Sequence, residues 1–357
     1  MHNQVTGEQP QPTVTRIVGA SGRPTIREVA QVAGVSRGTV SRYLNGQKWV
    51  GADSATAIRQ AIDTTGYSPN REARSLASGR ATTVVFLLTA SHEDLFNSRI
   101  YSMLMSDISN ALLERGMSLV LMTACNAAER AAALEFVRGG SVHGVMLLAS
   151  RVGDPLIGHL AAAGVRTVCC GRPMAWESQV SSSSADDRTG GREATALLAA
   201  EGRSRIGIIT GPLGVGGAVD RLEGYLEALD AAHLPRDMGR VIEGDWTRDS
   251  GRAGAEALLA ADPSLDAVFA SNDSMAAGAI DALRAAGRSV PHDVSVVGFD
   301  DSGLAATLDP PLTTLRQPFA AIGREMVRLL LEQPADQITH TTHPAQLVVR
   351  GSTRGES

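Results

Sequence analysis

The sequence predicts an all-α helix-turn-helix head followed by a larger α/β core, which has two lobes built on doubly wound parallel sheets. Two short helical patterns separated by a glycine occupy residues 24–46. From Thr82 onward, short apolar runs alternate with helical patterns, which is typical of parallel strands joined by crossover helices. The length of 357 residues leaves room for two or three domains with full cores.

The first helix of the head is marked by its start signal and by an apolar stripe. Thr25 stands before it as an N-cap, and Glu28 follows at the capping-box spacing. Gly34 ends the helix, and Val35 can fill the small core behind it. The stripe at helical spacing consists of Ile26, Val29, Ala30 and Ala33.

The second helix of the head carries the residues expected to contact DNA. Ser36 can cap it, Val40 and Leu44 face inward, and arginines remain on the outer face. This helix fits the DNA major groove, where arginine can bind guanine or phosphate. A small helical hairpin with a solvated arginine face would carry the same pattern. The predicted DNA contacts here are Thr25, Ser36, Arg37, Gly38, Thr39, Ser41, Arg42 and Asn45.

Charge is distributed unevenly along the chain. The formal net charge is −5, yet residues 23–80 hold nine Lys and Arg against four Asp and Glu, and residues 1–22 balance. The remainder therefore carries −10. A basic head on an acidic body indicates that only the head touches DNA.

Cysteine usage and hydropathy indicate a cytoplasmic protein. The three cysteines, Cys125, Cys169 and Cys170, lack metal-ligand spacing and suit a reducing compartment. No apolar run approaches the ~20 residues of a membrane span, and the N-terminus lacks the hydrophobic stretch of a signal peptide. His340 and His343 form an isolated pair in a polar tail and are expected to be solvated, and no metal or other cofactor is predicted.

The head and its continuation resemble the lactose/galactose-repressor family of bacterial regulators. The resemblance spans about residues 24–353. In the head it rests on Thr25-Ile26, Val29-Ala30, Ala33-Gly34-Val35-Ser36, Thr39-Val40-Ser41-Arg42, Leu44-Asn45-Gly46, Gly66-Tyr67, Pro69-Asn70, Ala73-Arg74-Ser75-Leu76 and Gly79. In the core it rests on Gly211-Pro212, 221–225, 243–246, 271–278, 291–301, 311–315 and 347–353.

The resemblance implies a hinge helix that folds on the operator. In that family, paired leucines from two subunits wedge into the minor groove, and Leu76 occupies this position. A lone helix of two turns is marginal, so a linker is the alternative. The hinge residues expected to contact DNA are Asn70, Ala73, Arg74 and Leu76.

The predicted organisation has five parts. The family resemblance implies a periplasmic-binding-protein-like core in which the chain crosses between lobes three times, so that the last helix returns to the first lobe. The parts are a disordered leader (1–22), the helix-turn-helix domain (23–68), the hinge (69–81), the effector-binding and dimerisation core (82–353) and a tail (354–357).

The elements of the two regions follow from apolar runs and helical patterns. The head has a third helix over 52–65, with Ile58, Ala61 and Ile62 inward and Gly66 as its stop. The Ser-rich stretch 181–184 is expected to be where the two lobes meet. Core strands are predicted at 83–89, 117–123, 143–148, 165–169, 205–210, 266–270, 294–298 and 345–350, and helices at 99–115, 127–138, 154–163, 188–201, 218–232, 249–260, 272–286 and 318–333.

Polar residues near predicted strand ends indicate a ligand crevice in the second lobe. Asp300 and Asn272 follow strands, and Arg221 lies on the helix after another. An arginine fork and a carboxylate suit the vicinal hydroxyls of a sugar, and Trp246 could contact a sugar ring. The alternatives are that Asn272 caps a helix and Trp246 is ordinary core. The predicted effector site comprises Phe96, Tyr101, Arg172, Arg221, Trp246, Asn272 and Asp300.

Two departures from the family pattern leave the effector open. Gly217 stands where a hydroxyl residue is common, and Gly171-Arg172 where an acidic residue is common in sugar binders. The Gly-rich stretch 211–217 lacks the lysine-containing ending of a P-loop, so it is not predicted to bind nucleotide.

The sequence therefore predicts a homodimeric transcriptional repressor that binds a pseudo-palindromic operator under control of a small effector, which is expected to be a sugar or sugar derivative. A regulator that needs a purine or other non-sugar corepressor is the alternative within this class. A solute-binding protein of the same lobe architecture would need no DNA-binding head. An enzyme would need a catalytic constellation, and the sequence displays no such motif.

Overall fold

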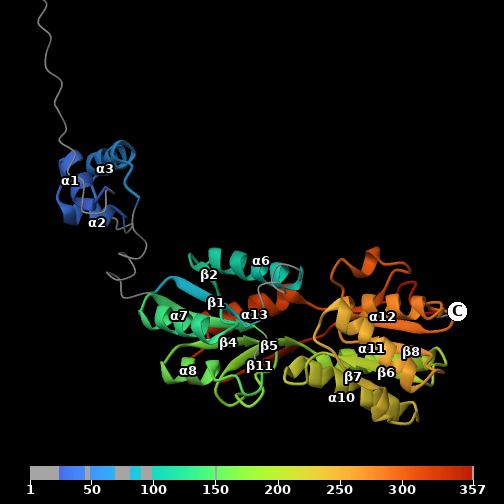
Figure 1. The fold of residues 1–357 in the computed structure, drawn as a ribbon. Coiled ribbons are helices and arrows are strands. Elements are labelled where there is room, and N and C mark those ends of the chain that lie inside the picture. Colours follow the sequence, from blue (N-terminus) through green and yellow to red (C-terminus); the bar gives the residue numbers. More distant parts are fainter. Residues whose placement is uncertain (1–23, 45–48, 69–80, 90–98, 149–150, 356–357) are drawn as a thin grey trace, which may run out of the picture. The chain divides into compact units, whose positions relative to one another are not determined.

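The computed structural model describes residues 24–44, 49–68, 81–89, 99–148 and 151–355. The chain divides into two compact units, Met1–Gly79 and Arg80–Ser357, and each is described by itself (Figure 1). The predicted leader, nearly all of the predicted hinge, and Phe96 lie outside the described residues.

Three helices form the head around one small core. They are α1 (Ile26–Val32), α2 (Arg37–Leu44) and α3 (Ala52–Thr65), as the sequence predicts. Val29, Val40 and Ile58 are fully buried where the three helices meet. Gly34 and Gly66 both have a φ of +65°, a conformation that favours glycine, and they end α1 and α3 respectively.

The first lobe is a six-stranded parallel sheet in the order β11-β5-β4-β3-β1-β2. Apolar clusters cover both faces, with α6 and α13 on one and α7 and α8 on the other. The strands are β1 (Thr83–Leu88), β2 (Ser118–Thr123), β3 (Val142–Leu148), β4 (Thr167–Cys170), β5 (Ser181–Ala185) and β11 (His340–His343). The helices are α6 (Arg99–Leu113), α7 (Ala127–Arg138), α8 (Leu156–Ala162) and α13 (Phe319–Leu331).

The second lobe has a six-stranded sheet in the order β12-β10-β9-β8-β6-β7, parallel except for the β10–β12 pair. Helices α9 and α10 cover one face, and α11 and α12 cover the other. The strands are β6 (Ile206–Thr210), β7 (Val241–Glu243), β8 (Ala267–Ala270), β9 (Ser295–Asp300), β10 (Thr313–Arg316) and β12 (Gln346–Val348). The helices are α9 (Asp187–Ala200), α10 (Gly216–Ala231), α11 (Arg248–Ala261) and α12 (Asp273–Ala285).

The chain passes between the lobes three times, after β5, after β10 and after β11. Helix α13 therefore lies in the first lobe although it comes late in the sequence, and Figure 1 shows its orange-red ribbon beside α6 and β1. Phe319, Ile322 and Met326 of α13 join the same buried cluster as Leu104 and Ile108 of α6. The crossings and the place of the last helix are as the family resemblance implies.

The Ser-rich stretch 181–184 is a buried strand, and its prediction as the meeting point of the lobes is wrong by a few residues. It belongs to β5, and the crossing follows it. The side chains of Ser182 and Ser183 are buried because β11 supplies partners: Ser182 Oγ lies 2.8 Å from His340 Nδ1 and Ser183 Oγ lies 3.1 Å from His343 Nε2. His340 and His343 lie in the edge strand β11 and not in a tail, although His340 is exposed to solvent as predicted.

Candidate functional site

The predicted DNA-contact face is the outer surface of α2. Ser36 Oγ accepts a hydrogen bond from the Thr39 backbone N–H at 3.1 Å, and this contact caps the helix. Arg37 and Gly38 are exposed in the next turn, and Arg42 is exposed with its Nε donating to Gly38 O at 3.2 Å. Within the described residues Arg37 has no ion pair, so its guanidinium can meet a base or a phosphate.

The remaining predicted DNA contacts are placed as follows. Thr25 precedes α1, its backbone N–H donates to Glu28 Oε2 at 2.8 Å, and the predicted capping box is present. Ser41 is half-buried on α2. The residues outside the described part of the chain, whose roles stay predictions, are Asn45, Asn70, Ala73, Arg74 and Leu76.

A buried charged network occupies the carboxyl edge of the second sheet. Arg221, on α10, donates from Nε to Asp187 Oδ1 at 2.8 Å, and its Nη2 lies 2.8 Å from the same oxygen. Its Nη1 donates to Ser271 O. Asp300 Oδ1 is 4.0 Å from Arg221 Nη2, and the guanidinium carbon lies 3.7 Å from the centre of the Phe299 ring. Two predicted residues, Arg221 and Asp300, are thus brought together.

Burial sets the protonation of this network. It raises the pKa of Asp300 to about 8, because desolvation outweighs the attraction of Arg221, while the neighbouring Asp273 raises the pKa further. Burial also raises the pKa of Asp187 despite its contact with Arg221. Next to them, Asp273 has a pKa raised to about 6, and its carboxylate accepts hydrogen bonds from Thr314 and Ser302.

Trp246 and Asn272 form the adjoining part of this edge. Asn272 caps α12 by accepting from the Met275 N–H at 2.8 Å, and its Nδ2 donates to Trp246 O at 3.0 Å. The Trp246 ring centre lies 5.6 Å from the Arg221 guanidinium. Its indole packs on Gly211, where any Cβ would come within 2.1 Å of a ring carbon.

Backbone strain gathers at the same edge. Trp246, Asp300 and Asp301 have φ values of +75°, +109° and +54°. Such conformations in residues other than glycine cost energy and cluster at ligand sites. Asp301 is held by arginines, because Arg350 Nη2 and Arg316 Nε each donate to it at 2.7 Å. Of the two neighbouring aspartates, Asp300 and Asp301, only Asp300 belongs to the Arg221 network.

The two lobes contact each other beside this network. Arg172, just after β4, forms an ion pair with Asp220 on α10, with 2.9 Å between Nη2 and Oδ1. Val152 N–H donates to Gly214 O at 2.8 Å. Gly216 permits the approach, since a Cβ there would lie 2.7 Å from Arg172 O. The Gly-rich loop is therefore a contact surface for the first lobe.

Sequence reasoning missed several residues of this edge. Asp187 begins α9 at the first crossing, and Gln317 Nε2 donates to Asp300 Oδ1 at 2.5 Å. Thr210 is the last residue of β6 and Ser271 directly follows β8, and the hydroxyls of both are buried. Asp187 could have been found as a carboxylate at a predicted helix start. Tyr101, by contrast, was predicted and lies half-buried on α6 against the first-lobe core.

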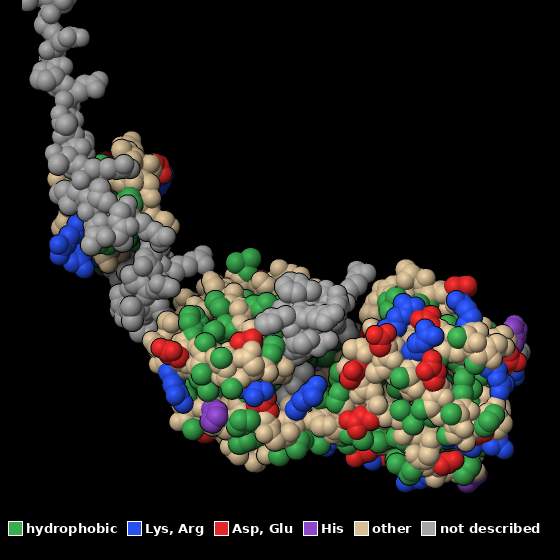
Figure 2. All heavy atoms as spheres, viewed as in Figure 1, with side chains coloured by type: hydrophobic (Ala, Val, Ile, Leu, Met, Phe, Trp, Pro, Cys, Tyr) green, Lys and Arg blue, Asp and Glu red, His purple; other side chains and the backbone are tan. Residues whose placement is uncertain are grey.

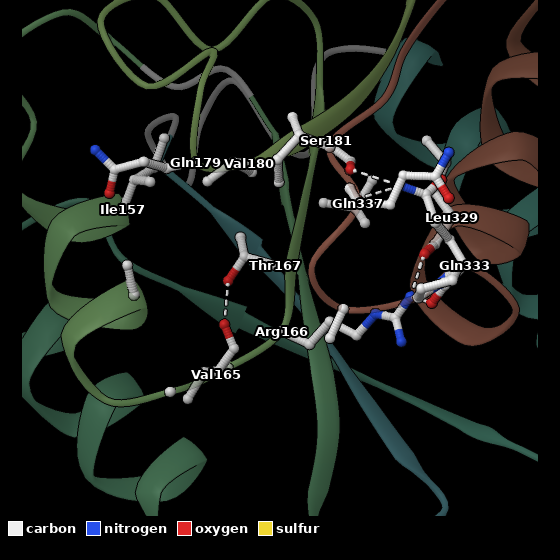
Figure 3. A pocket seen from close by; sticks show the side chains of 16 residues that line it. Ile157, Val165, Arg166, Thr167, Gln179, Val180, Ser181, Leu329, Gln333 and Gln337 are labelled. Carbon is white, nitrogen blue, oxygen red and sulfur yellow. Dashed lines mark hydrogen bonds between the residues drawn. The ribbon is translucent and has the colours of Figure 1, made fainter.

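A separate cavity of about 200 Å³ lies in the first lobe, at the edge where β4 and β5 begin (Figure 3). Its polar groups bond to one another: Arg166 Nη2 donates to Leu329 O at 2.8 Å, and Gln333 Nε2 donates to Ser181 Oγ at 3.3 Å. Ligands of open α/β sheets bind at the carboxyl ends of strands, so this cavity is not the predicted effector site.

A helix-turn-helix head joined to a two-lobed core with a polar network at its strand ends defines a DNA-binding transcriptional regulator. Residues 25–70 match the family of bacterial regulatory proteins of the lacI type, and residues 195–353 match the periplasmic binding protein-like domain. The chain belongs to the LacI family. Among the described residues, no helix is long and apolar enough to span a membrane.

Known relatives cover nearly the whole chain. The transcriptional regulator CelR of Thermobifida fusca is 44% identical over 92% of this chain and 96% of that protein. The ribose operon repressor of Escherichia coli K12 is 34% identical over 92% and 99%.

Two solved structures share the fold across the same span. A CelR–cellobiose complex has a TM-score of 0.74 at 41% identity, over 92% of this chain and 100% of that one. A lac repressor dimer bound to operator and anti-inducer has a TM-score of 0.81 at 27% identity, over 93% and 99%.

Proposed function

We propose that this protein is a cytoplasmic repressor that binds a pseudo-palindromic operator as a homodimer and responds to a neutral sugar, with cellobiose as the first candidate. The observation that carries the effector half is the network of Arg221, Asp187 and Asp300 at the second-lobe strand ends. Trp246 adds an aromatic ring within 5.6 Å of the Arg221 guanidinium. Carboxylate, guanidinium and indole together suit a hydroxylated ring with an apolar face.

The likeness to CelR supports cellobiose in particular. That relative is 44% identical along almost the entire chain, and its solved complex contains cellobiose. The lobe contact through Arg172 and Asp220 lies next to the network, so a ligand there can change the relation between the lobes. A ligand that favours one arrangement shifts the population towards it, which is how binding would reach the DNA-binding head.

The homodimer rests on an uncovered face of the first lobe. Met103 and Leu113 on α6 are 44% and 68% exposed, and Leu121 on the edge strand β2 is 42% exposed. The other exposed side chains of α6 described by the structure are neutral: Ser102, Ser106, Ser109 and Asn110. In the view of Figure 2, this lobe shows fewer charged side chains than the second lobe. A face poor in charge with exposed apolar residues is typical of an interface core.

Operator binding with and without cellobiose tests the regulatory part. The operator is first selected from random DNA by the purified protein, and its affinity is then measured by fluorescence anisotropy. We expect cellobiose to change that affinity at least several-fold, while ribose and hypoxanthine do not. A response to hypoxanthine alone would favour the purine alternative, and no response to any of the three would reject the proposed effector.

A charge on the uncovered face tests the dimer. We expect Leu113→Glu to convert a dimer into a monomer in sedimentation and to abolish high-affinity operator binding, because a buried unpaired carboxylate is costly. Ala257→Glu, on the exposed side of α11, is the matched control and should leave both properties unchanged. A dimer that survives Leu113→Glu would place the interface elsewhere.

A further inference from the structure

Three residues form a row across the second sheet directly under Arg221. In β6 and β8, Ile209 pairs with Ala270, and the Ser271 N–H donates to Ile209 O, so Thr210 lies beside Ser271. The register of β8 and β9 places Phe299 next in the same row. These three side chains point to the face that α9 and α10 cover, because residues two positions earlier belong to that buried cluster.

The first two members of the row carry unpartnered hydroxyls. Thr210 and Ser271 are fully buried, and within the described residues neither Oγ1 of Thr210 nor Oγ of Ser271 has a hydrogen-bond partner. Buried hydroxyls in native proteins are nearly always bonded, because an unsatisfied one forfeits its hydration without return. Valine in place of Thr210 and alanine in place of Ser271 would fill the same space without that cost. The presence of the two hydroxyls therefore indicates that a ligand supplies their hydrogen bonds.

Arg221 does not supply the missing hydrogen-bond partner of these hydroxyls. Its Nε and Nη2 are engaged by Asp187, its Nη1 by Ser271 O, and its flat face by Phe299. The guanidinium is therefore held in place and already compensated by a carboxylate. Because Asp187 already neutralises Arg221, the described residues around the row offer no free positive charge that would attract an anion.

We infer that Thr210 and Ser271 form a hydroxyl subsite at the strand ends that binds a hydroxyl group of a neutral, polyhydroxylated effector and discriminates against anionic ones. Each serine or threonine hydroxyl can donate one hydrogen bond and accept others, which matches a sugar hydroxyl that also does both. Sugar phosphates and sugar acids would bring a negative charge beside Asp187, where the Arg221 guanidinium is already paired. This inference rests on the proposed sugar effector and adds residues that read its hydroxyl pattern.

The test uses isosteric variants of the full-length protein. Thr210→Val and Ser271→Ala remove the hydroxyls and keep the packing. We expect each to weaken cellobiose binding about fivefold by calorimetry, the loss of a hydrogen bond, and to leave the Tm of the free protein equal or higher, because an unpaired buried hydroxyl is gone. Glucose 6-phosphate should bind neither the wild-type protein nor the variants.

Thr195→Val is the matched control. Thr195 is equally buried, on α9, but its hydroxyl donates to Gly191 O at 2.9 Å. We expect this variant to have the cellobiose affinity of the wild type and no gain in Tm.

Three results would overturn the subsite: unchanged cellobiose affinity in both variants, a Tm of the free Thr210→Val protein well below that of the wild type, or tight binding of the phosphorylated sugar. Failure of the proposed function is a separate result, because it is seen in the wild type, which would then bind no sugar. In that case the Tm values of the free variants still decide whether the hydroxyls lack partners.

Discussion

Arg172 of the first lobe and Asp220 of the second form an ion pair across the lobes, with 2.9 Å between Nη2 and Oδ1. The pair is partly exposed, at 38% for the arginine and 20% for the aspartate side chain. Burial raises the pKa of Asp220 to about 6, although Arg172 pulls it down, so the pair weakens as pH falls through that value.

Breaking this pair should loosen the contact between lobes and reduce effector affinity. We expect Arg172→Ala or Asp220→Ala to weaken effector binding by about 0.5–1 kcal/mol, a small loss because the pair is partly solvated. The loss arises because fewer molecules then hold the two lobes in the arrangement that binds the effector. Calorimetry with cellobiose measures the loss. The double variant should be no weaker than either single variant, and additive losses would mean that the two residues act separately.

Arg221 should be essential for the effector and dispensable for DNA. Arg221→Lys keeps the charge but loses the planar fork that engages Asp187 and Ser271 O. We expect a loss of ~2–4 kcal/mol in cellobiose binding, since polar groups at the site are left unpaired. Operator affinity without effector should stay within about twofold, measured by anisotropy. Normal sugar binding with lost DNA binding would make Arg221 a structural residue.

Asp300 should make the protein less stable as pH rises. Its pKa is about 8 in the folded state, above the ordinary aspartate value of 3.8, so the folded state holds its proton more tightly than the unfolded state does. The stability that the protonated carboxyl contributes is therefore lost as pH rises towards 8. Between pH 6 and 8.5, the Tm of Asp300→Asn should fall less steeply than that of the wild type.

The matched control for this pH dependence is Asp336→Asn. Asp336 is an exposed aspartate of the first lobe. The Tm of the Asp336→Asn variant should follow that of the wild type across the whole pH range. Parallel Tm profiles for Asp300→Asn and the wild type would contradict the raised pKa of Asp300.

Arg37 should read sequence, whereas other arginines of the head should contribute charge. We expect Arg37→Ala to cost ~1–3 kcal/mol on the selected operator and to relax base preference at one position in each half-site. Arg27→Ala, an exposed arginine of α1, should weaken specific and random DNA alike and lower the salt dependence. Competition binding with a library of single-base operator variants distinguishes the two effects. Equal losses on all sequences for Arg37→Ala would assign Arg37 to phosphate.

The head and the alternation of strands and helices could be predicted because their signals are local. The stripe of Val29 and Ala30, the cap at Ser36 and the stop at Gly66 each act within a few residues. The strand β5 escaped prediction because nothing local marks a run of serines as buried. Its hydroxyls become acceptable only when β11 brings His340 and His343 from more than 150 residues away.

The same distinction divides the site. Arg221, Asn272 and Asp300 could be anticipated, since parallel strands gather their carboxyl ends at one edge. The hydroxyls of Thr210 and Ser271 could not, because their burial without partners depends on how the sheet and its covering helices pack in the folded lobe. The pairing of Arg172 with Asp220 also depends on how the two lobes meet.

The late return of α13 to the first lobe constrains how this protein can be made on the ribosome. Six of its residues complete a core whose other members come mostly from the first 90 residues of that unit: Phe319, Ile322, Met326, Val327, Leu329 and Leu330. Until they leave the exit tunnel, one face of the first sheet is covered by α6 alone, while the second lobe is already largely synthesised. The core of the first lobe can therefore close only after most of the second lobe has been synthesised, and its apolar residues are open to non-native association during that interval.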